Sequence, residues 1–404
     1  MDGADRDIEA FDIVVLGGGI HGVGVLQAAA ARGHRALLLE ERDLASGTSS
    51  RSSKLIHGGL RYLESGQFGL VRESLAERAI LCRLAPELVK LVPFFVPVYR
   101  ETTRRPWKLR AGLSLYALLG GLAKDAWFQR VPRRDWDQLD GLRLDGLQYV
   151  FRYLDGQTDD ALLTRAVAAS AEELGAEVRE AARFVSAQKT AHGYRVRYDA
   201  VSGPVEVETR VLVNAAGPWV ERVRAAILPE PPGFAVDFIA GTHIEVEGAT
   251  RAGIYYCEAP QDQRAVFTMP WRGHTLVGTT ETPFVGDPRT VEPSSDEIAY
   301  LLAVHRDYFP GRESAVLGAW AGLRVLPKTC ARAFDRPRET SLVVDADVPS
   351  YLAIYGGKLT GYRATAAKVL DRLASSLPQR AWLADTASLA LRSPAPRESA
   401  ATTN

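Results

Sequence analysis

The segment TSSRSSKLIHGGLRYLE, residues 48–64, gathers side chains that can bind anions and move protons. It holds five Ser and Thr hydroxyls, three cations and His57, and the pair Gly58-Gly59 allows the chain to turn tightly. Hydroxyls and cations donate hydrogen bonds to phosphate oxygens, and a histidine can accept a proton near neutral pH. The segment therefore predicts an anion-binding loop.

A glycine fingerprint lies upstream of this loop. Residues 11–16 (FDIVVL) predict a buried strand that runs into GGGIHG. Residues 23–32 then predict a helix with small side chains. Residues 35–40 predict a second strand that ends in Glu40. The G-x-G-x-x-G positions are Gly17, Gly19 and Gly22. Such glycines let the backbone approach a pyrophosphate, the helix N-terminus offers N–H groups, and the carboxylate binds a ribose without a 2′-phosphate. The fingerprint predicts a dinucleotide site but does not by itself separate FAD from NAD.

Two further glycine-containing segments follow much later in the chain. Residues 209–219 (TRVLVNAAGPW) predict a strand that breaks at Ala215 and Gly217, where backbone can approach a ligand; a plain exit from a strand is the alternative. Residues 351–363 (YLAIYGGKLTGYR) repeat the pattern before a predicted helix at 364–373, whose start would direct N–H groups and a lysine at an anion. A second helix start of this kind favours a larger cofactor held at both ends.

Together these motifs resemble one family. GGGIHG, Glu40, TSSRSSKLIHGGLRYLE, NAAGPW, GTHIEVEG, the arginine of AGLRVLP and GGKLTGYR resemble the FAD-dependent glycerol-3-phosphate dehydrogenases, within the D-amino-acid-oxidase-like flavoproteins, from about residue 11 to about residue 373. The resemblance implies that sn-glycerol 3-phosphate is oxidised to dihydroxyacetone phosphate and that electrons pass through FAD to a quinone or another acceptor. Most family members continue past GGKLT into a helical C-terminal domain, so the resemblance also predicts a catalytic core followed here by a polar tail.

The resemblance assigns roles to individual residues. Oxidation of a secondary alcohol by hydride transfer needs a proton acceptor, donors to the developing oxyanion and cations for the phosphate. The implied catalytic residues are His243, Arg324 and Lys358, and the implied substrate-binding residues are Arg61, Tyr62 and Arg338. The implied cofactor-binding residues are Gly17, Gly19, Gly22, Glu40, Thr48, Ser49, Ser50, Lys54, His57, Gly58, Ala215, Gly217, Gly357, Lys358, Leu359 and Thr360. No metal site is expected.

Several of these residues have an alternative role. Arg61 could pair with Glu64 on a helix surface, and His243 could be a satisfied core histidine in an alternating strand. Arg338 shares its segment with Arg332 and Arg336, which leaves the register open. Two other functions also stay open: a related flavoenzyme acting on a hydroxy acid or an amine, with its cations binding a carboxylate, and a flavin-binding subunit without turnover of its own.

Composition limits partners and location. Among 404 residues, Lys and Arg total 49 and Asp and Glu total 49, so overall charge gives no support for nucleic acid as a partner. Three scattered cysteines, an acidic start and the lack of a long apolar run predict a cytoplasmic protein. The basic, Trp-containing residues 104–110 and the apolar residues 111–123 could rest on the inner face of a membrane, or pack on their own domain. A homodimer stays open.

The elements that must position these residues form two units. Helical periodicity covers residues 72–85, and alternating runs at 195–198, 243–246, 266–269 and 275–279 predict strands of a mainly antiparallel sheet. The fold class expected is α/β, a Rossmann-like FAD-binding domain with an inserted, mainly antiparallel β-sheet substrate domain. The FAD-binding domain is expected at 1–60, 145–235 and 324–375, the substrate domain at 61–144 and 236–323, and a disordered polar tail at 376–404.

Overall fold

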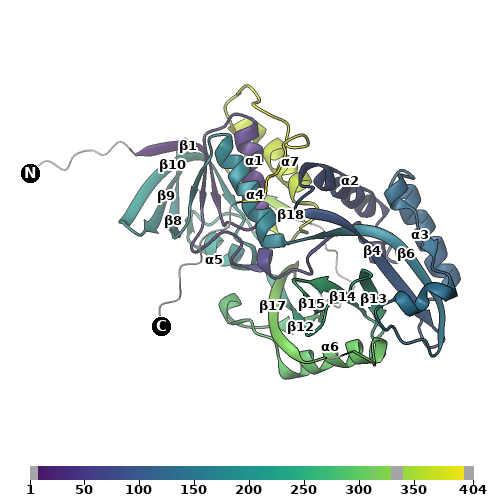
Figure 1. Ribbon diagram of the computed structural model, residues 1–404. Helices are drawn as coiled ribbons and strands as arrows, with labels where there is room; N and C mark the ends of the chain where they lie inside the picture. Colours follow the sequence, from purple (N-terminus) through teal and green to yellow (C-terminus); the bar gives the residue numbers. More distant parts are fainter. Residues whose placement is uncertain (1–7, 313, 329–339, 395–404) are drawn as a thin grey trace, which may run out of the picture.

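Two β-sheets organise the chain (Figure 1). The computed structural model describes residues 8–312, 314–328 and 340–394. The first sheet has nine strands in the order β11-β8-β9-β10-β1-β2-β7, with β19 beside β10 and β18 beside β19. These strands are β1 (Glu9–Leu16), β2 (Ala36–Leu39), β7 (Glu177–Arg179), β8 (Arg183–Thr190), β9 (Gly193–Ala200), β10 (Gly203–Asn214), β11 (Ile227–Leu228), β18 (Ser341–Val344) and β19 (Tyr351–Tyr355).

The centre of the first sheet is parallel and covered on both faces. Strand β1 pairs in parallel with β2 and β10, and β10 pairs in parallel with β19. Successive side chains of β1 point to opposite faces, so Val15 packs beneath helices α1, α4 and α7 and Val14 packs toward α5. The helices are α1 (Ile20–Ala31), α4 (Asp160–Glu173), α5 (Val220–Ala225) and α7 (Tyr362–Leu373). This layering brings three strand ends, those of β1, β10 and β19, to one edge.

The second sheet has ten strands and is mainly antiparallel. Its order is β16-β12-β15-β14-β13-β4-β6-β3, with β17 beside β12 and β5 beside β6. Only the pairing of β13 with β4 is parallel among the described strands of this sheet. The strands are β3 (Leu55–Ile56), β4 (Val89–Tyr99), β5 (Gln129–Arg130), β6 (Leu147–Thr158), β12 (Val236–Val246), β13 (Ile254–Glu258), β14 (Ala265–Trp271), β15 (His274–Gly278), β16 (Thr282–Phe284) and β17 (Val316–Pro327).

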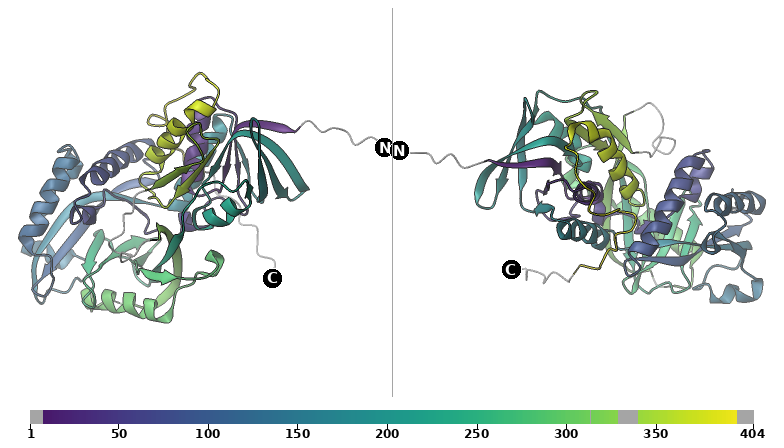
Figure 2. Two further views of the ribbon diagram at one scale, coloured as in Figure 1. Left: turned by 180° about the vertical axis from the view of Figure 1, so that it is seen from behind. Right: turned by 90° about the horizontal axis from the view of Figure 1, so that it is seen from above.

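Helices also cover the second sheet on both faces. Helix α6 (Ser295–Tyr308) buries Leu301 and Val304 on one face, whereas α2 (Phe68–Leu84) and α3 (Pro106–Leu119) bury Leu75 and Tyr116 on the other. Figure 2 shows the two sheets side by side, with α3 at the outer end of the second and α2 between α3 and α7. The expected fold class, a Rossmann-like domain with a mainly antiparallel second domain, is confirmed.

Three details differ from the sequence-based expectation. Strand β6 was expected in the FAD-binding domain, which was placed at 145–235, but it pairs with β4 along its whole length in the second sheet, so this boundary moves to the end of β6. Residues 195–198 were grouped by their alternation with strands of the mainly antiparallel sheet, although the expected FAD-binding domain included them; they lie in β9, which forms hairpins with β8 and β10 in the first sheet. Short connections between consecutive strands favour this pairing.

The segment after α7 also differs from the expected free tail. Residues 377–394 contain no helix or strand, yet Leu391 is only 4% exposed and its N–H donates to the carbonyl oxygen of Leu84 at 2.7 Å. The N–H of Leu383 donates to the carbonyl oxygen of Ala31 at 2.8 Å. Apolar residues within a polar composition therefore fix this segment against α1 and α2.

Candidate active site

A cavity of about 640 Å³ lies where the two units meet. Its wall combines the glycine fingerprint, the loop that precedes β3, the break after β10 and the turn after β19 with residues of β12 and β17 from the second sheet. This volume is in the range of ligand sites, and glycines supply much of the wall in three segments. A cavity with such a wall suits a long ligand that needs close backbone contact.

The glycine fingerprint has no room for side chains. Gly17 has φ +107°, and a Cβ there would lie 2.8 Å from the carbonyl oxygen of Ala215; a Cβ on Gly22 would lie 1.9 Å from the carbonyl oxygen of Gly17. Glu40 directly follows β2 and accepts hydrogen bonds from the N–H groups of Gly18 at 2.6 Å and Arg42 at 2.9 Å. This fixed carboxylate and the glycine cradle fit the ribose and pyrophosphate of a dinucleotide.

His21 provides a second test of the fit. Its ring lines the cavity, and a Cβ on Gly357 would lie 2.1 Å from its Nε2, so the two glycine-rich segments touch here. Neither ring nitrogen has a hydrogen-bond partner within the described ranges. Burial lowers the pKa of His21 to about 4, so the ring is neutral. Buried nitrogens on a cavity wall require a polar partner, which a bound FAD would supply.

The loop that precedes β3 ties both units to the cavity. Thr48 Oγ1 donates to the carbonyl oxygen of Leu323 in β17 at 2.8 Å, and Ser49 Oγ accepts from the N–H of Ile20 at 2.9 Å. Further along, the N–H of His57 donates to Thr360 Oγ1 at 3.2 Å. These hydroxyls therefore hold the segments of the wall together as well as lining it.

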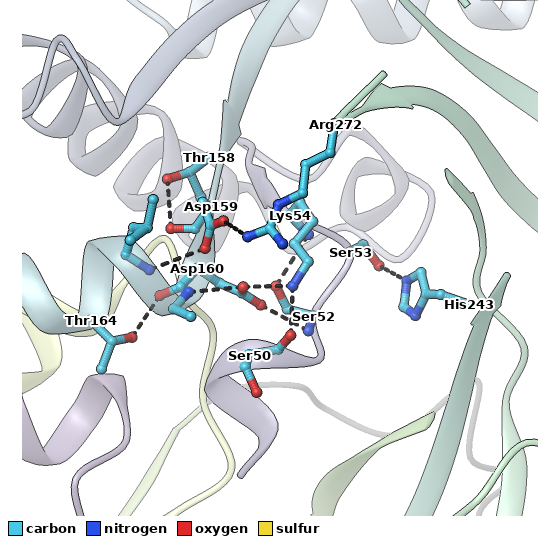
Figure 3. Close-up of polar contacts among 12 residues, drawn as sticks. Ser50, Ser52, Ser53, Lys54, Thr158, Asp159, Asp160, Thr164, His243 and Arg272 are labelled. Carbon is cyan, nitrogen blue, oxygen red and sulfur yellow. Dashed lines mark hydrogen bonds and ion pairs between the residues drawn. The ribbon is translucent and has the colours of Figure 1, made fainter. Parts of the chain in front are cut away.

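Lys54 points away from the cavity. Its Nζ donates to Asp160 Oδ1 and to the carbonyl oxygen of Ser50, both at 2.6 Å, and its side chain is 5% exposed (Figure 3). Burial raises the pKa of Asp160, an effect that the ion pair with Lys54 opposes. The neighbouring Ser53 points to the opposite side, toward His243 (Figure 3).

His243 lies in the cavity wall on β12. Its Nε2 is 2.9 Å from Ser53 Oγ, its ring stacks on Trp320, and the residue is 2% exposed. Burial, with the positive charges of Arg324 and Lys54, lowers the pKa of His243 to about 3. His243 is therefore neutral throughout the physiological range.

A group that we call the cation cluster lies next to His243. It consists of Arg61, Arg264 and Arg324 around the carboxylate of Glu281. Glu281 Oε1 accepts from Arg324 Nη1 at 2.7 Å and lies 3.8 Å from Arg61 Nη2, and Oε2 is 3.0 Å from Arg264 Nη2. The alternative partner of Arg61, Glu64, pairs with Arg104 instead.

Lys358 and Tyr62 bring a further cation to the wall. Lys358 Nζ lies 3.6 Å from the centre of the Tyr62 ring, a cation–π contact between the C-terminal glycine segment and the loop that holds Arg61. Gly59 has φ +75°, and a Cβ there would lie 2.3 Å from the Tyr62 ring. The tight turn at Gly58-Gly59 therefore lets the tyrosine ring fold back over the chain.

The structure brings most of the sequence-predicted residues together. The following line the cavity: Gly17, Gly19, Glu40, Thr48, Ser49, His57, Tyr62, Ala215, Gly217, His243, Arg324, Gly357, Lys358, Leu359 and Thr360. Gly22, Ser50, Lys54, Gly58 and Arg61 are not in the wall, although Arg61 belongs to the cation cluster. Arg338 lies outside the described residues. The roles of all these residues stay predictions.

Three residues of the site were missed from the sequence. Ser53 carries no signal that separates it from its serine neighbours, His21 lies at the start of a helix, and Glu281 follows two threonines in GTTET without a recognisable motif. Only His21 carried a usable signal, because it lies inside the glycine fingerprint. The other two depend on pairings between distant strands.

A glycine-cradled cavity between a parallel sheet and an antiparallel one defines the class of protein as a dinucleotide-dependent oxidoreductase of two domains. Residues 12–366 match the family model "DAO: FAD dependent oxidoreductase". The chain therefore belongs to the DAO family, and its cofactor is FAD.

Curated relatives and solved structures agree with this family. The chain is 39% identical over 382 residues to a glycerol-3-phosphate dehydrogenase of Pseudomonas aeruginosa, covering 90% of this chain and 72% of the relative. It is 34% identical to the aerobic glycerol-3-phosphate dehydrogenase of Escherichia coli, covering 91% and 74%. The glycerol-3-phosphate dehydrogenase from Bacillus halodurans, solved with FAD, superposes with a TM-score of 0.74 at 25% identity, covering 96% of this chain and 68% of that one.

The described residues contain neither a membrane span nor a cluster of metal ligands. Within them, no helix is both long and apolar enough to cross a membrane. Over the same ranges, no group of three or more His, Cys, Asp or Glu side chains is arranged to hold a metal ion.

Proposed function

We propose that this FAD-dependent oxidoreductase oxidises sn-glycerol 3-phosphate to dihydroxyacetone phosphate. The observation that carries the proposal is that Arg324 and Lys358, from distant segments, line one cavity with His243, while Arg61 shares the carboxylate of Glu281 with Arg324. Guanidinium and ammonium groups are the side chains that best bind a phosphate monoester. The glycerol-3-phosphate dehydrogenases among the curated relatives support the same substrate.

FAD supplies the acceptor for the hydride that leaves the secondary alcohol carbon. Arg324 and Lys358 bind the substrate phosphate and hold the carbon in place, which converts binding energy into orientation. A charge-assisted hydrogen bond to phosphate contributes roughly 1.5 to 3 kcal/mol, so two or three cations would select the phosphate ester strongly over plain glycerol.

His243 would contact the substrate hydroxyl as a neutral imidazole. With a pKa of about 3 it is a weak base, so it accepts a hydrogen bond from the hydroxyl and takes the proton as the hydride departs, when the acidity of the hydroxyl rises. Ser53 Oγ, 2.9 Å from Nε2, would keep the ring in one orientation. The nearby Arg324 would stabilise negative charge that develops on the oxygen.

Anaerobic reduction of the bound flavin tests the proposal. We expect sn-glycerol 3-phosphate to bleach the visible absorbance of the purified holoenzyme, whereas glycerol, which lacks the phosphate, should bleach it at least about 100-fold more slowly because the cations have nothing to bind. Small 2-hydroxy acids and amino acids serve as the second comparison. Bleaching by one of these, and none by the phosphate ester, would contradict the proposal.

The electron acceptor is proposed to be a quinone or a similar compound at a membrane surface. Helix α3 supports a peripheral contact, because Trp107 is 68% exposed and Leu118 is 60% exposed, with Trp127 near its end at 58%. Arginine and lysine side chains precede and follow Trp107. Sedimentation with anionic vesicles at low salt tests this contact, and a Trp107→Ala, Leu118→Ala variant should sediment less; an equal fraction would exclude α3 as the contact.

A further inference from the structure

Glu281 lies behind the residues that face the cavity. It follows β15 in the turn before β16, its side chain is 5% exposed, and it is absent from the cavity wall. Both carboxylate oxygens already have guanidinium partners: Oε1 accepts a hydrogen bond from Arg324, and Oε2 forms an ion pair with Arg264 at 3.0 Å. A carboxylate held in this way cannot reach a substrate hydroxyl, so its action on a reaction must pass through its partners.

Arg324 connects Glu281 to the cavity. One of its terminal nitrogens, Nη1, donates to Glu281, and the other, Nη2, lies over Gly241, where a Cβ would be 3.4 Å away. Gly241 and Arg324 both line the cavity, and the charge of Arg324 acts on neighbouring His243. The guanidinium group of Arg324 is therefore held by Glu281 through Nη1, while Nη2 lies beside Gly241 in the cavity wall.

Glu281 offsets part of the positive charge beside the cavity. Three guanidinium groups share its carboxylate, and Lys358 brings a further positive charge to the cavity wall. A phosphate monoester carries about −1.5 to −2 at pH 7. Removing the Glu281 carboxylate would add one positive charge next to the place where such a dianion is proposed to bind.

The main chain that carries Glu281 is fixed from outside. Glu297 on α6 accepts hydrogen bonds from Thr280 Oγ1 at 2.6 Å and Thr282 Oγ1 at 2.7 Å, the residues on either side of Glu281. Its other oxygen accepts from Thr242 Oγ1 at 2.9 Å, next to His243. Helix α6 therefore holds the Glu281 turn and the His243 strand at a constant separation.

We infer that Glu281 is a positioning residue for substrate binding and that it sets the selectivity of the site. It orients Arg324 and Arg61 for the phosphate ester, and its negative charge limits the affinity for free inorganic anions. This inference rests on the proposed function, because it takes the cavity next to the cation cluster as the place where the substrate phosphate binds.

The test compares Glu281→Gln with Glu281→Asp in the holoenzyme. Glutamine removes the charge at nearly constant volume, so Arg324 loses its orientation while the site gains positive charge. We expect kcat per bound flavin to fall at least about tenfold and the Kd for inorganic phosphate, measured by calorimetry, to decrease at least about threefold. Aspartate keeps the charge but shortens the reach, so phosphate affinity should stay near that of the unmodified protein while kcat remains reduced.

Glu258→Gln is the matched control. Glu258 is 8% exposed in the same sheet and pairs with Arg104 at 2.9 Å, but it does not line the cavity. This control should lose a similar amount of thermal stability with unchanged kcat and phosphate affinity. The inference would be overturned if Glu281→Gln bound phosphate more weakly than the unmodified protein, or if its kcat stayed within twofold. It would also be overturned if both Glu281 variants lost FAD while the Glu258→Gln control retained it.

These measurements distinguish an error in the proposed substrate from an error in the proposed role of Glu281. If the unmodified protein is not reduced by sn-glycerol 3-phosphate, the proposed substrate is wrong. If it is reduced but the Glu281 variants behave like the control, only the positioning role of Glu281 is wrong.

Discussion

The Lys54–Asp160 pair and the cation cluster show two uses of buried charge. Lys54 and Asp160 are 5% and 0% exposed at the side chain, one cation meets one carboxylate, and backbone atoms satisfy the remaining groups. In the cation cluster three arginines, each 20% to 29% exposed, share Glu281. A closed pair satisfies its own charges inside the fold, whereas a cation on a cavity wall, such as Arg324, can attract an external anion.

The largest expected effect on stability comes from removing one member of the Lys54–Asp160 pair. Lys54→Met leaves Asp160 buried without its cation, which should lower the free energy of unfolding by about 3 to 5 kcal/mol, measured by urea denaturation of the holoenzyme. The double variant with Asp160→Leu removes both charges and should recover part of that loss. If the Lys54→Met variant kept normal stability but bound FAD weakly, Lys54 would serve the cofactor. The contrast between a structural ion pair and a ligand-binding cluster would then be wrong.

Truncation of the open cluster should have a smaller effect on stability and a larger one on turnover. Arg324→Ala removes a phosphate donor and the charge beside His243, and we expect kcat/KM for the substrate to fall about 10³-fold, roughly 4 kcal/mol, while FAD content stays constant. Stopped-flow reduction and the flavin absorbance of the purified variant measure the two quantities. Loss of FAD together with activity would show that Arg324 serves the cofactor.

The smallest effect expected is one of pH on the turn that carries Glu281. Burial raises the pKa of Glu297, but hydrogen bonds from Thr280, Thr282, Ser294 and Thr242 outweigh it, so the folded pKa lies below the ordinary value of 4.5. A depressed folded pKa gives stability that is present above pH 4.5 and lost as the pH falls through the folded value. The difference in unfolding free energy between the unmodified protein and Glu297→Gln should therefore shrink from pH 6 to pH 3, and a constant difference would contradict this.

Most of the cofactor-binding residues predicted from local sequence patterns line the cavity. The strand, glycines and helix at residues 11–32 and the GGKLTG segment specify backbone conformation directly, because only glycine tolerates the close approaches seen at Gly17 and Gly22. The same reasoning found most of the wall. It did not predict the direction of Lys54, whose ammonium group lies on the Asp160 side of the loop, because local sequence does not reveal on which side of a loop consecutive side chains lie.

Pairings across the fold could not be predicted. Glu281 meets Arg61 and Arg324 only because β12 joins β15, β16 and β17 in one register, and no short-range signal sets that register. The pKa of His243 has the same origin, because its burial and its neighbours come from separate strands. The residue types in the site were readable from the sequence; their electrostatic state required the tertiary structure.

The contact between His57 and Thr360 has a consequence for biosynthesis. The two residues are 303 positions apart, and the parallel pairing of β10 with β19 closes the same edge of the first sheet. Such contacts form after long loop closure, so the nascent chain must leave the ribosome to about residue 360 before the wall of the cavity is complete. FAD should therefore be captured after translation of the catalytic region, and ribosome-bound fragments that end before β19 should remain colourless.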